Sequence, residues 1–213
     1  MKSCWACVMQ TYHRYNYILL IFGIRAQNDF GLGMANSIAA IMAGAEVAHV
    51  TVNGIGERTG NTSLEELVMA LRLLYGITTS VRAERLRDLS KLVESLSGIN
   101  LPPQKPVVGD DIFTIESGII AGWWRRLEKI DMPLEMYPFV PELVGHGKIE
   151  VILGKKSGKD SIYYMLEKKG MEMDEKEVEK VLTEVKELSI KNKRYVTNDE
   201  FMAIVKKHKN KAA

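Results

Sequence analysis

Cysteine is scarce in this sequence, charge is balanced, and no long hydrophobic run occurs. The 213 residues contain only Cys4 and Cys7, and two cysteines cannot cross-link a chain of this length, so we expect a reducing compartment, the cytoplasm. The formal net charge of +2 gives no overall field that favours nucleic acid or a membrane surface. The longest apolar run, residues 17–24, is far shorter than the roughly 20 residues of a membrane helix. The 46% hydrophobic and 26% charged residues are instead typical of a globular domain.

Strand and helix signals alternate in the first half. Residues 1–16 show neither periodicity nor turn signals, so we expect no regular element there. The apolar, β-branched run Tyr17–Ile24 predicts a strand covered on both faces, as in a parallel sheet. A small-residue helix over Met34–Ala43, a strand over Val47–Val52 and a helix after Ser63 follow. This alternation predicts an α/β fold.

Two signals mark the helix after Ser63. Ser63 and Glu66 have the spacing of a capping box. The apolar residues of this segment fall on one helical face, and they are Leu64, Leu67, Val68, Leu71 and Leu74.

The second half reads as mainly helical. An amphipathic helix from Leu86 should end at Gly98, and the stiff connector Leu101–Pro106 is the best boundary. We therefore expect a divergent N-terminal segment (1–24), an α/β part (25–100) and a helical subdomain (101–213). The elements expected in that subdomain are a helix around Ile112–Leu127, a strand over Ile149–Leu153 and helices over Asp160–Lys169, Asp174–Ser189 and Asn198–Lys209.

A glycine-rich loop between the second strand and the capped helix is the first candidate site. It runs from Gly54 to Asn61 and includes Gly56, Glu57 and Gly60. In a parallel α/β protein, the carboxyl ends of strands carry the functional loops. Glycines there let backbone N–H groups approach an anion, although a tight turn alone has the same pattern.

The order of several motifs carries a resemblance to one enzyme family. RAQNDFGLGMANS at residues 25–37, the glycine-rich loop with its flanks, and the stretches 103–118 and 141–162 resemble the isopropylmalate, homocitrate and citramalate synthases, and more distantly hydroxymethylglutaryl-CoA lyase. The resemblance implies the last two βα units of a (β/α)₈ TIM barrel, followed by a mostly α-helical C-terminal subdomain. It covers the chain from about Asn28 to the C-terminus.

The resemblance also implies a reaction. The synthases are acyltransferases that condense an acyl-CoA with a 2-oxo acid in a Claisen-type step, in leucine or related biosynthesis, with a divalent metal (Mn²⁺, Mg²⁺ or Zn²⁺). By this resemblance the partners are acyl-CoA and a 2-oxo acid, with no role for nucleic acid or membrane. The residues that it assigns to the substrate and CoA loop are Asn28, Asp29, Gly54, Gly56 and Glu57.

The metal site implied by the resemblance is incomplete in this sequence. The family's His-x-His pair falls on Arg25 and Gln27, and only Asn61 is retained as a ligand. Arginine is a permanent cation with no acceptor atom, and a single amide oxygen holds no divalent ion. The Asp-Arg-Glu stretch of the first strand has no counterpart. We therefore expect this chain alone to bind no metal and to have no activity.

A second departure lies in the family's HESGIH motif. Both histidine positions are isoleucine, Ile115 and Ile120, while Glu116 and Ser117 are retained. We interpret the two isoleucines as core residues of one helix, although their presence also fits a divergent or non-catalytic relative.

The other chemically suggestive residues have plainer explanations. Cys4 and Cys7 have redox-motif spacing without the expected preceding strand, and we attribute that spacing to chance. His49 should be an interior histidine, and Trp123–Arg126 should pack rather than stack on a base. The terminal run 206–211 should be a solvated helix end.

Three hypotheses follow. The chain is a truncated or frame-shifted synthase, inactive alone, in which the family similarity begins abruptly near Asn28 because the reading frame changes there. Alternatively, it is a non-catalytic partner or regulator of a full-length synthase, or a small α-rich binding module. Uncovered strand edges and apolar faces predict self-association or pairing with a full-length synthase.

Overall fold

The computed structural model describes residues 5–14 and 17–209, with side chains from residue 21 onward. The chain divides into two compact units. Unit 1 comprises the residues up to Ile112 together with Glu142–His146, and unit 2 comprises Phe113–Pro141 and the residues from Gly147 onward. Among the described residues, no helix is both long and apolar enough to cross a membrane.

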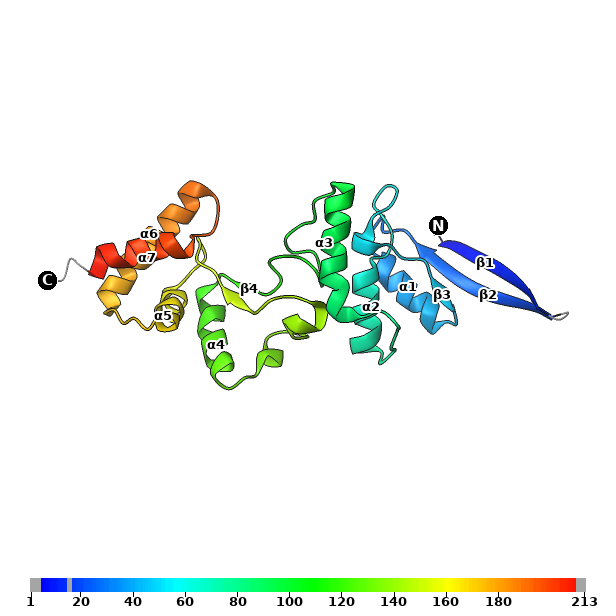
Figure 1. Ribbon diagram of the computed structural model, residues 1–213, viewed down its shortest axis with the longest axis horizontal. Helices are drawn as coiled ribbons and strands as arrows, with labels where there is room; N and C mark the ends of the chain where they lie inside the picture. Colours follow the sequence, from blue (N-terminus) through cyan, green and yellow to red (C-terminus); the bar gives the residue numbers. More distant parts are fainter. Residues whose placement is uncertain (1–4, 15–16, 210–213) are drawn as a thin grey trace. The chain divides into compact units, whose positions relative to one another are not determined.

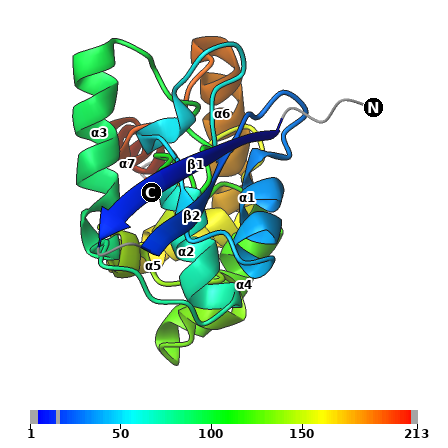
Figure 2. The same ribbon diagram turned by 90° about the vertical axis from the view of Figure 1, so that its right-hand side faces the viewer.

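Unit 1 contains a mixed sheet in the order β1-β2-β3 (Figures 1 and 2). Strand β1 (Trp5–Arg14) pairs antiparallel with β2 (Tyr17–Ala26), and β2 pairs parallel with β3 (Val47–Ala48). The parallel pair was expected, whereas the absence of structure before residue 17 was a wrong expectation. The adjacent strand β2 offers a complete row of backbone partners to residues 5–14, and that segment lacks the regular alternation of apolar and polar residues that marks a strand in a sequence.

The second expected strand is shorter than its apolar pattern. After β3, the residues Val52–Gly54 form a 3-10 turn in which Asn53 has a φ of 64°. The positive φ ends the extended conformation and starts the glycine-rich loop. Asparagine tolerates this left-handed region better than most residues.

Three helices complete unit 1. They are α1 (Gly33–Met42), which packs against β2, α2 (Leu64–Leu74) and α3 (Leu86–Ser97). Gly98 ends α3 in the left-handed conformation with a φ of 69°, as expected for a C-terminal glycine.

The capping box predicted for α2 is absent. Ser63 precedes the helix in extended conformation, but its side chain makes no capping hydrogen bond. The Glu66 carboxylate pairs with the Lys105 ammonium group instead. The expected apolar face is only partly covered by the described residues, because Leu67 and Leu71 are buried whereas Leu74 is 75% exposed.

Unit 2 combines a small parallel sheet with four helices. Strand β4 (Thr114–Ile115) pairs with β5 (Glu150–Val151). The helices are α4 (Gly118–Lys129), α5 (Lys159–Lys168), α6 (Glu175–Asn192) and α7 (Asn198–Lys209). The last three helices match the sequence pattern closely. The helix expected from Ile112 begins only at Gly118, since the preceding residues pair with β5.

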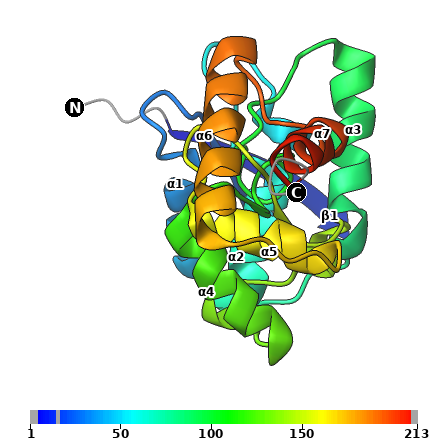
Figure 3. The ribbon, with the colours of Figure 1, turned by 90° about the vertical axis from the view of Figure 1, so that its left-hand side faces the viewer.

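Helices α5, α6 and α7 pack around one apolar core (Figures 1 and 3). Asp174 begins α6 with a genuine capping box, in which its Oδ1 accepts the Glu177 N–H at 2.7 Å and its own N–H donates to Glu177 Oε2 at 3.0 Å. The fully buried side chains of the core include Ile162, Val178, Val181, Val185 and Phe201. Such a packed core gives the loops of unit 2 a rigid support.

Candidate functional site

The three positions that the family resemblance assigns to metal ligands lie together in unit 1. Gln27, just after β2, forms an isolated antiparallel bridge with Asn61. Arg25, near the end of β2, donates a long hydrogen bond from Nε to Asn61 Oδ1 at 3.5 Å. The end of β2 and the glycine-rich loop therefore meet at these residues.

Backbone hydrogen bonds hold the glycine-rich loop against the end of β2. Thr62 N–H donates to Ala26 O at 3.2 Å, and Asn61 N–H donates to Gly54 O at 3.1 Å. Gly60 has a φ of +85°, and a Cβ there would lie only 2.0 Å from Gly54 O. A side chain is thus excluded at Gly60 by both conformation and space.

Asn28 and Asp29 are engaged in holding this region together. Asn28 Oδ1 accepts the Gly33 N–H at 3.0 Å, which satisfies one donor at the start of α1. Asp29 Oδ1 accepts from Arg58 Nε at 3.3 Å and from Thr59 Oγ1 at 3.0 Å. The hydrogen bond from Arg58, followed by that from Thr59, lowers the pKa of Asp29. Of the remaining loop residues, Glu57 is exposed.

Asn61, Gln27 and Arg25 form a poor donor set for a divalent cation. The Asn61 amide oxygen faces the Arg25 guanidinium, whose permanent charge repels a metal ion. Gln27 Oε1 is buried without a hydrogen-bond partner, but it is a weak neutral ligand. Within the described residues, no three His, Cys, Asp or Glu side chains are grouped for metal binding. The residues present at this site do not fit the metal that the family uses.

A buried polar network that lies next to the glycine-rich loop was not predicted from the sequence. Asn53 N–H donates to Glu65 Oε2 at 3.1 Å, and Asn53 exchanges hydrogen bonds with Ser90, whose Oγ donates to Asn53 Oδ1 at 2.6 Å. Glu65 is only 1% exposed, and Lys105 Nζ lies 3.9 Å from its Oε1. The Asn53-Gly54 turn dipeptide was the available signal. The network anchors the loop to α2 and α3.

In unit 2, the segment corresponding to HESGIH holds a second loop. Glu116 Oε1 accepts the Lys156 N–H at 3.0 Å, and Ser157 Oγ donates to the Glu116 carbonyl at 3.4 Å. Ile115 is a core residue, as expected, although it lies in β4. Ile120 is 37% exposed in the first turn of α4, so its expected core position is wrong. Ser117 precedes α4 without a capping hydrogen bond.

The tryptophan pair divides between core and surface. Trp124 is buried and makes an edge contact with Tyr137 at 6.4 Å between ring centroids, which confirms packing for this residue. Burial raises the pKa of Tyr137 to about 12. Trp123 is instead 45% exposed.

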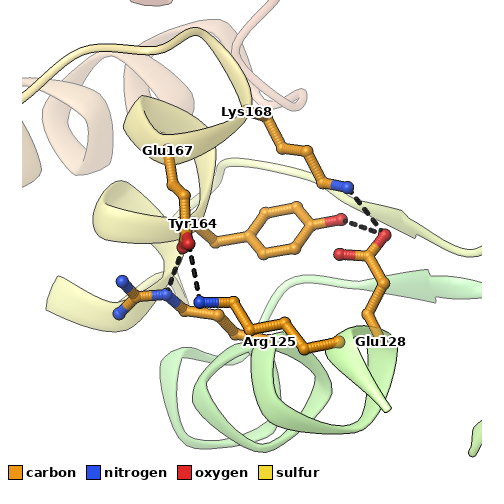
Figure 4. A pocket seen from close by; sticks show the side chains of 6 residues that line it. Arg125, Glu128, Tyr164, Glu167 and Lys168 are labelled. Carbon is orange, nitrogen blue, oxygen red and sulfur yellow. Dashed lines mark hydrogen bonds and ion pairs between the residues drawn. The ribbon is translucent and has the colours of Figure 1, made fainter. Parts of the chain in front are cut away.

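Ion pairs between α4 and α5 line a cavity of about 290 Å³ (Figure 4). Glu167 pairs with Arg125 and with Lys129, whose Nζ is 2.7 Å from its Oε1. Glu128 accepts hydrogen bonds from Tyr164 at 3.2 Å and from Lys168 at 2.8 Å. Each charged side chain drawn in Figure 4 therefore has a partner of opposite charge. These ion pairs join α4 to α5.

The structure corrects the expectation for His49 and adds contacts to the C-terminal helix end, whose Lys206, Lys207 and Lys209 are exposed as expected. His49 is exposed rather than interior, because β3 ends before it. In the basic C-terminal run, Lys207 and His208 both pair with Glu184 on α6, at 2.8 and 2.7 Å, so these side chains tie α7 to α6. Cys4 lies outside the described residues, and the side chain of Cys7 is likewise not described.

Comparison with family models divides the chain in two. Residues 7–93 match the HMGL-like family, and residues 107–193 match the homocitrate synthase post-HMGL domain-like family. The first match includes β2 and most of β1, so the similarity does not begin abruptly at Asn28. That expectation was wrong, and the inferred change of reading frame at Asn28 loses its support.

Individual relatives agree with the family models. The chain is 47% identical over 171 residues to a "Probable 2-isopropylmalate synthase" of Methanopyrus kandleri, covering 80% of this chain and 33% of the relative. It is 40% identical over 186 residues to "Homocitrate synthase 1" of Nostoc sp., covering 87% of this chain and 48% of the relative. An (R)-citramalate synthase of Methanocaldococcus jannaschii is 39% identical over 184 residues, 86% of this chain and 36% of the relative. The chain thus spans about a third to a half of the length of these relatives.

Proposed function

Because this chain belongs to the HMGL-like family of isopropylmalate, citramalate and homocitrate synthases, we propose that it corresponds to the carboxyl-terminal part of a cytoplasmic enzyme that condenses an acyl-CoA with a 2-oxo acid. Strands β2 and β3, each followed by a helix, correspond in this proposal to the last two βα units of a TIM barrel. Unit 2 corresponds to the helical subdomain that follows the barrel. The class of reaction is a Claisen-type acyl transfer in amino-acid biosynthesis.

On its own, the chain does not catalyse this reaction. The observation that carries this part of the proposal is the contact of Arg25 Nε with Asn61 Oδ1. In this proposal Arg25 replaces a histidine that would donate a lone pair to a metal ion, and its guanidinium group is a permanent cation without an acceptor atom. Gln27 adds at most one neutral amide oxygen, which does not offset the repulsion by the guanidinium group.

The remaining geometry fits a structural contribution to a larger assembly. Asn28, Asp29 and the glycine-rich loop are held in place by hydrogen bonds that need no metal ion. Apolar side chains of unit 1 stand exposed among the described residues, with Phe30 at 91% and Leu96 at 79%. Exposed apolar side chains of this kind are typical of protein–protein contact sites.

A thiol-release assay tests the enzymatic part of the proposal. The purified chain is incubated with acetyl-CoA, a panel of 2-oxo acids and Mn²⁺, Mg²⁺ or Zn²⁺, and free CoA is measured. We expect no CoA release that depends on the 2-oxo acid. Turnover by the chain alone, lost in an Asn61→Ala variant and retained in a Glu187→Gln variant on the exposed face of α6, would contradict the proposal.

The second candidate is a non-catalytic partner or regulator of a full-length synthase, and the exposed apolar residues of unit 1 favour it. Mixing the chain with a full-length synthase from the same source distinguishes the two. Co-elution with the synthase, together with a changed synthase rate, supports the partner function. Separate elution with an unchanged rate rejects it.

A further inference from the structure

Unit 2 contains a cavity of about 610 Å³ whose lining includes none of Arg25, Gln27 and Asn61. It lies where the loop between β5 and α5 meets the C-terminal end of α6 and the residues after it. Its volume is within the range of roughly 300–1,000 Å³ that is typical of small-molecule sites. The residues that line it are Glu116, Lys155, Lys156, Ser189, Ile190, Lys193, Arg194 and Tyr195.

Positive charge dominates this cavity. Four of the lining side chains are cationic, and the only acidic one is Glu116. Arg194 forms a two-pronged ion pair with Glu200, at 2.9 and 2.7 Å. Within the described part of the chain, the ammonium groups of Lys155, Lys156 and Lys193 have no ion-pair partner. Three cations are therefore available to an anionic ligand.

The walls of the cavity are fixed by hydrogen bonds. In the loop, Gly154 N–H donates to Ser157 Oγ at 2.9 Å, and Glu116 accepts the Lys156 N–H. At the end of α6, Lys193 has a φ of 51°, and the Ser189 hydroxyl donates to Arg194 O at 2.8 Å. These bonds hold the walls in place before any ligand arrives, which lowers the entropic cost of binding.

The two segments are also joined directly. Val196 N–H donates to Leu153 O at 2.8 Å, and these residues form a bridge. Lys155 and Lys156 of the loop and Lys193 at the end of α6 therefore line the same cavity.

An apolar patch borders the cations. Ile190 is 62% exposed and Tyr195 is 40% exposed, and both line the cavity. Aromatic side chains bind bases by stacking, while lysine ammonium groups are common phosphate ligands. The combination of three unpaired lysines with an exposed aromatic ring suits a ligand that carries both phosphates and a flat ring.

We propose that this cavity binds the diphosphate and base of a nucleotide. In this arrangement Lys155, Lys156 and Lys193 contact the phosphates, and Tyr195 with Ile190 contacts the base. The same chemistry is found in a free nucleoside diphosphate and in the nucleotide end of coenzyme A. Only the second source rests on the proposed function of the chain.

Calorimetric titration of the full chain with ADP, inorganic pyrophosphate and coenzyme A tests the proposal. We expect ADP to bind with a dissociation constant below about 1 mM and to weaken as salt is added, because salt screens phosphate contacts. The double variant Lys155→Glu/Lys193→Glu should weaken ADP binding by about tenfold or more. Tyr195→Ala should weaken ADP binding but leave pyrophosphate binding unchanged.

The matched control is Lys176→Glu/Lys180→Glu, two exposed lysines of α6 outside the cavity. It makes the same change in net charge, and we expect it to retain ADP affinity within about twofold. Circular dichroism confirms that each variant is folded before titration. Absence of ADP binding at low salt, or an equal loss in the control variant, overturns the proposal.

The source of the ligand follows from the relative affinities. Coenzyme A binding about tenfold tighter than ADP assigns the cavity to coenzyme A, and equal or weaker binding assigns it to free nucleotide. The titration requires no turnover and no metal ion, so its failure would leave the proposed synthase relationship unaffected.

Discussion

Arg25 Nε lies 3.5 Å from Asn61 Oδ1, although 36 positions separate the two residues in the sequence. The contact joins the end of β2 to the glycine-rich loop. The guanidinium group of Arg25 donates directly to the amide oxygen of Asn61. By the family resemblance, Arg25 stands at a position of a metal-binding histidine, and a guanidinium group there opposes a bound cation.

The two helix starts with capping-box spacing should respond differently to mutation. Asp174→Ala removes a capping bond of α6 and should lower the free energy of unfolding of unit 2 by about 1 kcal/mol. Ser63→Ala should leave the stability of unit 1 almost unchanged, because the Ser63 hydroxyl makes no capping bond. Urea denaturation followed by circular dichroism measures both effects. A clear loss in Ser63→Ala would contradict the structure of the start of α2.

The glycine-rich loop should not tolerate a side chain at Gly60. Gly60→Ala places a Cβ against Gly54 O in a left-handed conformation, and we expect a loss of about 2 kcal/mol or more in the free energy of unfolding. Gly147→Ala is the control, because nothing lies within 4 Å of its added Cβ. Thermal denaturation of the two variants gives the comparison. Equal melting temperatures would show that the loop is not held as described.

Acid should weaken the turn before α7. Hydrogen bonds from Arg194 and from the backbone of Thr197 lower the pKa of Glu200 from 4.5 to about 2. Because the folded-state pKa is depressed, this carboxylate contributes stability above pH 4.5, and the contribution is lost as the pH falls towards 2. Glu200→Gln should therefore flatten the pH dependence of unfolding in this window. An NMR titration of Glu200 with a midpoint near 4.5 in the native protein would contradict the prediction.

Exposed apolar side chains should cause self-association. Leu92 and Leu96 on α3 are 54% and 79% exposed among the described residues, and light scattering should detect dimers or larger species. Leu92→Lys/Leu96→Lys should shift the population towards monomer. Ser95→Lys, on the same helix, is the control and should not do so. A monomeric unchanged chain at high concentration would reject the prediction.

Local sequence patterns predicted the helical parts of the fold well. The valines of α6 recur at helical spacing and all turn inward, so Val178, Val181 and Val185 marked this helix correctly. Strand β1 was not expected because residues 5–14 lack a regular apolar–polar alternation, and their strand conformation depends on pairing with β2. The start of α4 was misplaced for the same reason, since the pairing of β4 with β5 converts residues before Gly118 into a strand.

Part of the candidate site could be predicted from the sequence. Arg25, Gln27 and Asn61 were expected together because the family resemblance assigns all three positions to one metal site. The buried Glu65 could not be found in this way. Its position next to Asn53 and Lys105 depends on tertiary packing, and its neighbour Glu66 carried the more obvious capping signal.

Metal titration of the intact chain tests the central claim most directly. Calorimetry with Mn²⁺ and Zn²⁺ should detect no site tighter than about 1 mM, because Arg25 opposes a cation at Asn61. Arg25→His/Gln27→His should strengthen binding only slightly, since no carboxylate joins the histidines at this site, and Asn61→Ala in that background should remove the gain. A stoichiometric micromolar site in the unaltered chain, abolished by Asn61→Ala, would contradict the account.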